Sequence, residues 1–381
     1  MTPRPSLSQR LRSTSPAAAF VAAALAGPVA APLAAQVPDL AMTERIKEEG
    51  MRRSQALDLF HTLTDVYGSR LSGSPEHRAA AEWVRDRFAA WGLSEARLEP
   101  FEFGPGWSLE KLSIEMTSPR YMPLIGYPDA WSPGVDGVLE GRVVYLGDRS
   151  LEQIRAMSDE LEGAIVFTNG QQTEFRDFDR PQPGLGEMVR TGNPPRLSAN
   201  APASMREIGP ILESAGAGIR IRPTTYRDGT VGGTGSRTTS PDAVPSLTLS
   251  AEQYNMIARL SERGVPVELR IELETAYGED TNTYNVLADI PGTDPAVADE
   301  VVLVGAHLDS WHTAVGATDN GDGALAVIEA ARILAALEAR PRRTIRFALW
   351  SGEEQGLLGA RAYIERHLQT EEERAKLQVY L

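Results

Sequence analysis

The chain has 381 residues, a length that favours two domains or one domain with a large insertion. Its 38 Lys and Arg stand against 52 Asp and Glu, and the net charge of −14 argues against nucleic acid or an anionic membrane as a partner. The sequence contains no Cys, so disulfides, thiolate chemistry and sulfur-rich metal sites are excluded, and any metal must be held by His and carboxylates. The five His are His61, His77, His307, His312 and His367.

Residues 1–35 have the order of an export signal. Three Arg precede an Ala-rich apolar run that begins near residue 17, and small residues favour cleavage after Ala35. The alternative is a membrane-anchoring helix, which is disfavoured because Pro28 and Pro32 interrupt the run before it reaches the length of a membrane span. We therefore expect a secreted or periplasmic protein without integral membrane association.

Residues 38–93 are helical in pattern, with one interruption at 67–75. Ser74 is placed to cap the helix that follows, and Pro75 suits its first position. The apolar face of this helix is predicted to consist of Ala79, Trp83, Val84, Phe88 and Trp91. We expect His77, in the first turn, and His61 to be exposed helix residues.

Residues 107–265 are rich in Pro and Gly and contain short β-like runs at 141–146 and 163–167. This texture is typical of a compact β-rich module with few helices. Residues 211–221 predict the end of a helix followed by a strand, and residues 229–239 predict a polar loop. No cluster in this part has obvious chemistry.

After residue 280 the pattern alternates between strand and helix, which is typical of an α/β fold with a mostly parallel sheet and covering helices. Strands are predicted at 284–290, 301–305 and 344–350. The continuous apolar run at 301–304 indicates a central strand buried on both faces. A helix is predicted to begin at Asp319, with apolar residues at helical spacing.

His307 follows the predicted central strand at its carboxyl end, where open α/β sheets build their sites. Its imidazole can ligate a metal through one nitrogen while the carboxylate of Asp309 accepts the other N–H. If this pair stood alone, a histidine with satisfied hydrogen bonds near a strand end would be the better interpretation.

A glycine-rich loop at 316–323 leads into the predicted helix. Asp319 can cap that helix, but a carboxylate in this loop can also bridge two cations with one oxygen on each. Asn320 and Asp322 are interpreted as solvated loop residues.

Glu353 and Glu354 directly follow the strand predicted at 344–350. Adjacent loop residues point in different directions, so one carboxylate can bind a metal while the other faces a water molecule that the metal activates. A glutamate pair alone is usually a solvated surface feature. Its position at the carboxyl end of a strand, beside the candidate ligand His307, favours a catalytic interpretation.

These three segments together resemble the zinc exopeptidases of the two-zinc aminopeptidase class, peptidase family twenty-eight. The elements that match are the strand followed by His307 and Asp309, the loop at 316–320 and the turn at 353–356. The likeness extends to the carboxypeptidase Q branch of the family, through residues 307–311 and their spacing to Asp319. Segments 67–75 and 284–292 also resemble the family, so the likeness covers nearly all of the chain after the signal.

The resemblance implies a metallo-exopeptidase with a central sheet and helices on both faces. It implies that His307 is a ligand of one zinc ion, that Asp319 bridges two zinc ions, and that Glu354 is a ligand of the other. Glu353 is the implied general base, and Asp309 is implied to orient His307. The implied substrate is a peptide or dipeptide, cleaved by an aminopeptidase, carboxypeptidase or dipeptidase activity.

The resemblance also predicts the domain boundaries. Residues 36–106 and 271–381 are expected to be the two parts of the peptidase domain, and the second part is expected to carry the metal ligands. Residues 107–270 are expected to form an inserted protease-associated domain that shapes access of the substrate and performs no chemistry.

The family pattern requires two further ligands, an Asp on the next strand and a later His. That strand is expected to start at 377–381, where the given chain ends, so the sequence is expected to be a fragment or a truncated, inactive form. His312 and His367 do not match the required His and are expected to be ordinary surface residues.

Two competing hypotheses share the fold. One is a non-catalytic binding protein like the relatives of the transferrin receptor, which usually lack the ligands that are in place here. The other is a single-zinc glutaminyl cyclase, against which the predicted insertion counts. Side-chain specificity and oligomeric state stay open, and a homodimer is compatible with the family.

Overall fold

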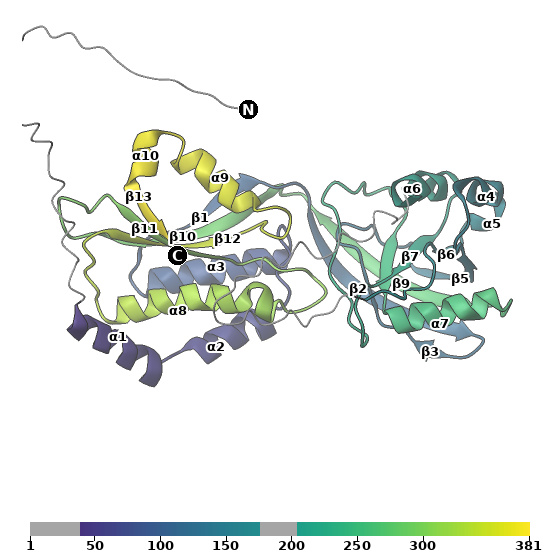
Figure 1. The fold of residues 1–381 in the computed structure, drawn as a ribbon, viewed down its shortest axis with the longest axis horizontal. Coiled ribbons are helices and arrows are strands. Elements are labelled where there is room, and N and C mark those ends of the chain that lie inside the picture. The colour runs from purple at the N-terminus through teal and green to yellow at the C-terminus, as the bar shows by residue number, and fades with distance from the viewer. Residues whose placement is uncertain (1–38, 176–203) are drawn as a thin grey trace, which may run out of the picture. The chain divides into compact units, whose positions relative to one another are not determined.

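The computed structural model describes residues 39–175 and 204–381 (Figure 1). By its contacts the chain divides after Thr43, within the first helix, and both sheets and the sites described below belong to the unit from Glu44 to Leu381. The predicted export signal, residues 1–35, lies outside the described residues. Within the described ranges no helix is both long and apolar enough to span a bilayer.

The amino-terminal part is helical, as predicted. It contains α1 (Leu40–Arg52), α2 (Ala56–His61), the π-helical turn η1 (Thr62–Val66) and α3 (Pro75–Ala90). Ser74 caps α3, because its hydroxyl accepts a hydrogen bond from the backbone N–H of His77 at 3.1 Å. The core of α3 includes Val84 and Phe88, as expected, whereas Trp83 and Trp91 are only partly buried.

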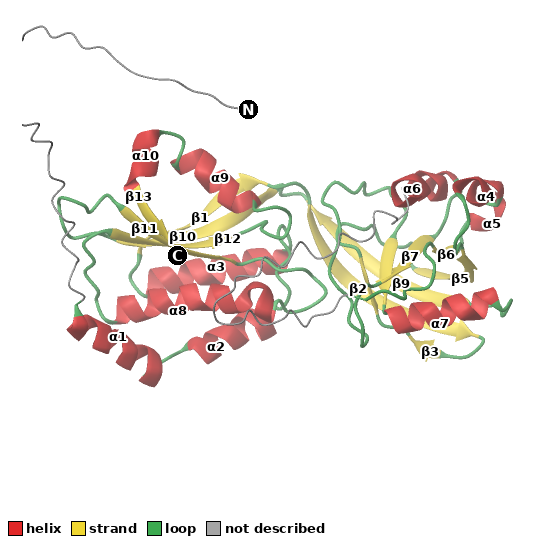
Figure 2. Cartoon of the chain, viewed as in Figure 1, coloured by secondary structure: helices red, strands yellow, loops and turns green. Residues whose placement is uncertain are grey.

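A five-stranded sheet, which we call sheet A, has the order β1-β10-β12-β11-β13 (Figures 1 and 2). Its strands are β1 (Ser94–Glu102), β10 (Asn282–Ile290), β11 (Val301–His307), β12 (Thr344–Trp350) and β13 (Leu377–Tyr380). The predicted α/β class and all four predicted strands of this region are confirmed. The sheet is mixed, however. The pairings β11·β12 and β11·β13 are parallel, whereas β1·β10 and β10·β12 are antiparallel.

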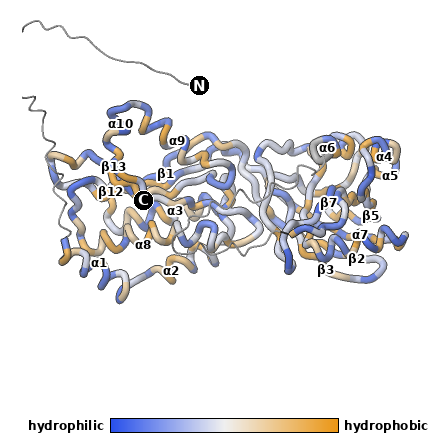
Figure 3. Tube along the Cα trace, in the orientation of Figure 1, coloured by the Kyte–Doolittle hydropathy of each residue, from blue (hydrophilic) through white to orange (hydrophobic). Residues whose placement is uncertain are grey.

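Helices cover both faces of sheet A, as predicted (Figure 2). On one face, α3 and α8 (Asp322–Ala336) pack on alternating residues of the strands; these include Val286, Ala288, Phe347 and Leu349. On the other face, α9 (Leu358–His367) contributes Tyr363 to a smaller cluster with Leu287, Leu303 and Ala348. Most of α8 is hydrophobic, in keeping with its packing on the sheet (Figure 3). The short helix α10 (Glu371–Lys376) precedes β13.

Two expectations for this region were wrong in detail. In β11 only Leu303 is fully buried, because the neighbouring β13 is a short and largely exposed strand. The helix begins at Asp322 and not at Asp319, since Asp319 and Asn320 have non-helical φ angles of −121° and −127° within the irregular turn η2 (Ala317–Gly321).

The part from residue 106 to residue 278 is rich in β structure, as predicted. Its eight-stranded sheet has the order β3-β2-β9-β5-β6-β7-β8-β4. The strands are β2 (Gly106–Ser118), β3 (Met122–Pro123), β4 (Gly126–Pro128), β5 (Val138–Tyr145), β6 (Ile165–Phe167), β7 (Ile219–Pro223), β8 (Ser246–Leu249) and β9 (Glu268–Gly278). The helices are α4 (Leu151–Ala156), α5 (Ser158–Leu161), α6 (Ser204–Ser214) and α7 (Ala251–Glu262). Residues 229–239 form the expected loop, with one isolated bridge from Gly235 to Ala130.

Candidate metal centre

Three loops meet at the carboxyl ends of β11 and β12. These strands are parallel neighbours whose last residues, His307 and Trp350, are in register. Because of this register, the turn after β12 lies beside the turn after β11. The third loop is η2, which leads from the turn after His307 into α8.

The three predicted metal ligands lie together. His307, Asp319 and Glu354 each offer one donor atom, and these three atoms lie within 4.8 Å of one another. His307 Nε2 is 3.2 Å from Asp319 Oδ1 and 3.8 Å from Glu353 Oε2. An imidazole and carboxylates without sulfur are a donor set that zinc accepts, so the residues present fit this metal.

Asp309 connects two of the loops and is fully buried. Its backbone carbonyl lies 3.0 Å from His307 Nδ1, closer than its own Oδ1 at 3.4 Å. The carboxylate accepts hydrogen bonds from the backbone N–H groups of Glu353 and Glu354, both at 3.3 Å. With Nδ1–H donated to the carbonyl, Nε2 is the nitrogen of His307 that faces Asp319 and that a metal would take in place of a proton.

The electrostatics of the cluster favour a cation. Burial by itself lowers the pKa of His307, but Asp309, Glu353 and Asp319 outweigh burial and raise this pKa to about 9. Burial and the nearby carboxylates of Asp319 and Asp309 raise the pKa of Glu354 to about 7. Several acidic groups are therefore held closer together than their charges favour, and a divalent cation would relieve that repulsion.

His77 was predicted to be exposed, and this prediction was wrong. Its side chain is 1% exposed and lies beneath the glutamate turn, with Nε2 2.9 Å from Ser351 Oγ and Nδ1 3.4 Å from Thr283 Oγ1. A signal was present in the sequence, since His77 is seven residues before Val84 and therefore on the face of α3 that is buried.

The other three His lie outside the cluster. His61 is exposed, as expected. His312 is not an ordinary surface residue, because its Nε2 lies 2.8 Å from the carbonyl oxygen of Pro128 and its ring meets Trp107 edge-on, with centroids 5.2 Å apart. His367 is 28% exposed and its Nε2 lies 2.8 Å from Glu99 Oε2. His312 and His367 each contact a residue more than 180 residues away in the chain, and no local sequence pattern predicts such a contact.

Asn320 and Asp322, which were interpreted as solvated loop residues, follow that expectation in part. Asp322 is exposed, as predicted. Asn320 is half-buried, and its Oδ1 accepts a hydrogen bond from the backbone N–H of Gly323 at 3.2 Å. Asn320 therefore helps to start α8.

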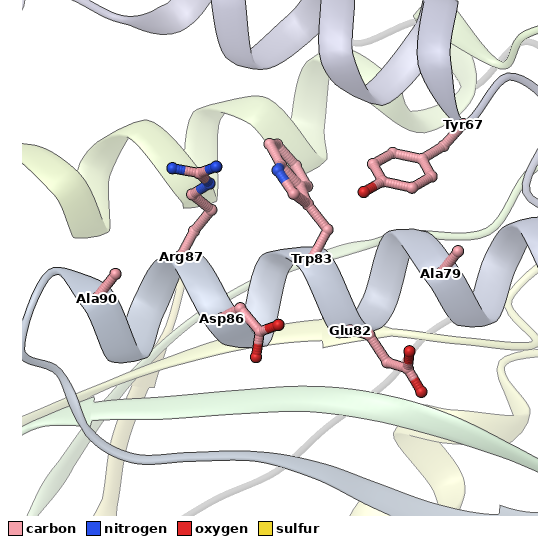
Figure 4. Close-up of a pocket in the computed structure, with 7 residues that line it drawn as sticks. All are labelled: Tyr67, Ala79, Glu82, Trp83, Asp86, Arg87 and Ala90. Atoms are coloured by element: carbon pink, nitrogen blue, oxygen red, sulfur yellow. The ribbon is translucent and has the colours of Figure 1, made fainter.

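A separate surface cavity of about 520 Å³ lies along α3 (Figure 4). Its lining residues are Tyr67, Ala79, Glu82, Trp83, Asp86, Arg87 and Ala90. None of the predicted site residues lines it, so it is not the candidate metal centre.

Residues 285–381 match the family model described as peptidase family M28. This segment of the chain is therefore similar to peptidase family M28. All three candidate ligands and Glu353 lie inside this matched segment.

Known peptidases resemble the chain over most of its length. Mouse carboxypeptidase Q is 27% identical over 324 residues, which cover 84% of this chain and 63% of the relative. The chain thus spans less than two thirds of that relative. The peptidase M28 precursor of Shewanella amazonensis SB2B is 26% identical, with a TM-score of 0.60 over 90% of this chain and 72% of that structure.

A more distant structure shares the fold. The zinc aminopeptidase BSAP of Bacillus subtilis is 18% identical, with a TM-score of 0.54 over 85% of this chain and 67% of that structure. The predicted α/β architecture therefore agrees with that of solved M28 peptidases and related folds.

Proposed function

We propose that the protein is a secreted, zinc-dependent exopeptidase. The observation that carries this proposal is the meeting of His307, Asp319 and Glu354 from three separate loops, with one donor atom of each within 4.8 Å of the others. The match to the M28 model and the similarity to carboxypeptidase Q support the reaction class. Aminopeptidase, carboxypeptidase and dipeptidase activities are all compatible with this site.

In this proposal the site holds two zinc ions. His307 would hold one ion, Glu354 would hold the other, and Asp319, whose side chain is 77% exposed, would be shared between them. Zinc, when bound, supplies a Lewis acid that polarises the scissile carbonyl and lowers the pKa of water.

Glu353 is proposed as the general base. Its carboxylate oxygen lies 3.8 Å from His307 Nε2, so it faces the same space as the ligands without belonging to their cluster. Glu353 accepts a proton from the attacking water and delivers it to the departing amine. The hydrogen bonds from the N–H groups of Glu353 and Glu354 to Asp309 hold the backbone of the turn that carries both glutamates.

The domain organisation is part of the proposal. Residues 36–106 and 271–381 form the peptidase domain, and residues 107–270 form an inserted protease-associated domain. The separate eight-stranded sheet supports an insertion at this place. Export rests on the pattern of residues 1–35 alone.

Exchanging each of the two glutamates for Gln in the full-length protein tests the assignment. Glu353→Gln keeps the shape but removes the base, so we expect zinc content to stay and turnover to fall by a factor of about 10² to 10⁴. Glu354→Gln removes a charged ligand, so zinc content and turnover should fall together. Zinc is measured by elemental analysis and turnover on peptides with free amino or carboxyl ends.

Glu365→Gln serves as the matched control, because Glu365 is an exposed glutamate of α9. Glu365→Gln should leave zinc content and turnover unchanged. If Glu353→Gln hydrolyses peptides as fast as the parent, Glu353 is not the base. If the parent hydrolyses no peptide although it binds zinc, a binding protein on the same fold is the better assignment.

A further inference from the structure

The loop between η1 and α3 contains a fully buried arginine that no catalytic step uses. We call residues 67–74 the Arg70 loop. The side chain of Arg70 is 0% exposed, and every hydrogen bond of its guanidinium goes to a backbone carbonyl. An arginine whose donors all bind backbone carbonyls holds the segments that carry those carbonyls in place.

Arg70 binds two of the three loops of the candidate metal centre. Its Nε donates to the carbonyl of Leu308, which lies between His307 and Asp309, at 2.7 Å. Its terminal nitrogens donate to the carbonyls of Val315 and Gly316, at 2.8 and 3.0 Å, at the start of the loop that carries Asp319. One side chain thus ties the loop of His307 to the loop of Asp319.

The backbone of the same segment adds further contacts. The N–H of Arg70 donates to Ser310 Oγ at 3.0 Å, and its carbonyl accepts from the N–H of Ser310 at 3.1 Å. Gly316 has a positive φ of 56°, and a Cβ there would lie 2.3 Å from the Cβ of Ser310. The two loops and Arg70 are therefore packed with no room for a side chain at position 316.

Ser72 reaches the third loop. Its Oγ accepts a hydrogen bond from the N–H of Gly352 at 2.7 Å, directly before Glu353 and Glu354. Ser72 is fully buried, so no water molecule can replace its hydroxyl as the acceptor for the N–H of Gly352. Each of the three loops that carry a candidate ligand is thus held by the Arg70 loop.

We propose that the Arg70 loop positions the metal ligands, with Arg70 and Ser72 as positioning residues that touch neither metal nor substrate. This inference rests on the proposed zinc site. The guanidinium suits the task because its donors form a rigid planar fork that reaches several carbonyls at once, whereas a lysine carries one small ammonium group at the end of a flexible chain. Residues that orient metal ligands typically change metal affinity by 10- to 100-fold when they are mutated.

The test uses Arg70→Lys, which keeps the charge, and Ser72→Ala, which removes one acceptor, in the full-length protein. We expect each variant to bind zinc 10- to 100-fold more weakly than the parent, measured by competition with a chromophoric chelator. The visible spectrum of the cobalt-substituted protein should also change, since it reports the arrangement of ligands and not stability. Thermal unfolding of the zinc-free protein separates a loss of ligand geometry from a loss of fold.

Two substitutions match these variants elsewhere in the chain. Arg149 also donates to backbone carbonyls, those of Tyr145 and Leu146, and Ser150 Oγ also accepts from a backbone N–H. Arg149→Lys and Ser150→Ala should therefore keep the zinc affinity and the cobalt spectrum of the parent.

The outcomes separate this inference from the proposed function. A parent that binds no zinc overturns the proposed zinc site itself. A parent that binds zinc, together with a folded Arg70→Lys or Ser72→Ala variant that keeps the parent's affinity and spectrum, overturns the role of that residue alone. If Arg70→Lys does not fold, Ser72→Ala decides the proposal by the same two measurements.

Discussion

His77 is a neutral histidine enclosed below the turn that carries the two glutamates. Its pKa is lowered from 6.5 to about 4, mainly because the ring is buried. The carboxylate of Asp309 raises this pKa, and the charge of Arg70 lowers it. Its Nε2 contacts Ser351 Oγ, which also donates to the backbone carbonyl of Tyr284. A proton added to His77 would therefore place a charge where no water can solvate it.

This burial predicts a specific dependence of stability on pH. The pKa of His77 is lower in the folded state, so the unfolded state binds more protons between pH 6.5 and about 4. The stability that neutral His77 contributes is fully present above about pH 6.5 and is lost as the pH falls toward 4. A shift from 6.5 to about 4 corresponds to about 3 kcal/mol in the free energy of unfolding.

Urea denaturation of the zinc-free protein at several pH values measures this effect. His77→Gln keeps a polar side chain but cannot take up a proton, so its stability should fall less steeply than that of the parent between pH 6.5 and 4. His61→Gln, at an exposed position of α2, should keep the slope of the parent. Equal slopes for the parent and His77→Gln would show that His77 is not held neutral.

Among the elements, α3 begins at the residue that the local sequence pattern predicted. Ser74 and Pro75 predicted the first residue of the helix, and the backbone of Ser74 is extended, with φ −81° and ψ 159°. Its hydroxyl accepts from the backbone N–H of His77 and so satisfies a donor that has no partner within the helix.

Removal of this cap should destabilise the protein measurably. We expect Ser74→Ala to lower the free energy of unfolding by about 1–2 kcal/mol, because Ser74 is 4% exposed and water cannot easily replace its hydroxyl. Thr370→Ala removes a cap of the same geometry from the exposed start of α10, and should cost about 0.5 kcal/mol. Denaturant titration of both variants checks the order, and a larger loss for Thr370→Ala would contradict it.

The start of α8 shows where a local pattern fails. The sequence placed the first residue of this helix at Asp319, but Asp319 and Asn320 are not helical, and the helix begins at Asp322. In this conformation Asp319 Oδ1 lies 3.2 Å from His307 Nε2. A helical Asp319 would follow the periodicity of α8, whereas the irregular turn directs its carboxylate to the cluster.

For the whole molecule, a metal bound to residues from three loops links zinc to stability. A ligand that binds only the folded state stabilises it by about 2.7 kcal/mol when its free concentration is 100 times the dissociation constant. The midpoint of thermal unfolding of the full-length protein should therefore be higher with zinc than with a chelator. His307 is the proposed ligand of one of the two ions, so its loss should reduce this difference.

The comparison of His307→Ala with His61→Ala checks this prediction by differential scanning calorimetry. His61 lies on α2 and outside the cluster, so His61→Ala should keep the full difference between zinc and chelator. A difference of the same size in His307→Ala would mean that zinc stabilises the protein from another site.

The sequence by itself determined the types and order of the elements in the part of the chain that matches the M28 model, and it pointed to the residues that meet in the cluster. Hydrophobic period, caps and turn residues are local, so they predicted α3, β10, β11 and β12 within a few residues. The motifs around His307, Asp319 and Glu354 were also local. The rule that sites form at the carboxyl ends of strands pointed to His307 and the glutamate pair, and the resemblance to the zinc exopeptidases implied the set of three ligands.

Only the tertiary structure decided how this cluster is supported. Arg70 and Ser310 are 240 residues apart, Ser72 and Gly352 are 280 apart, and His77 and Ser351 are 274 apart. The antiparallel pairing of β10 with β12 was decided at the same level. Burial and hydrogen bonding between such distant segments depend on the packing of the complete fold, and no local pattern of hydrophobic or charged residues specifies which of them meet.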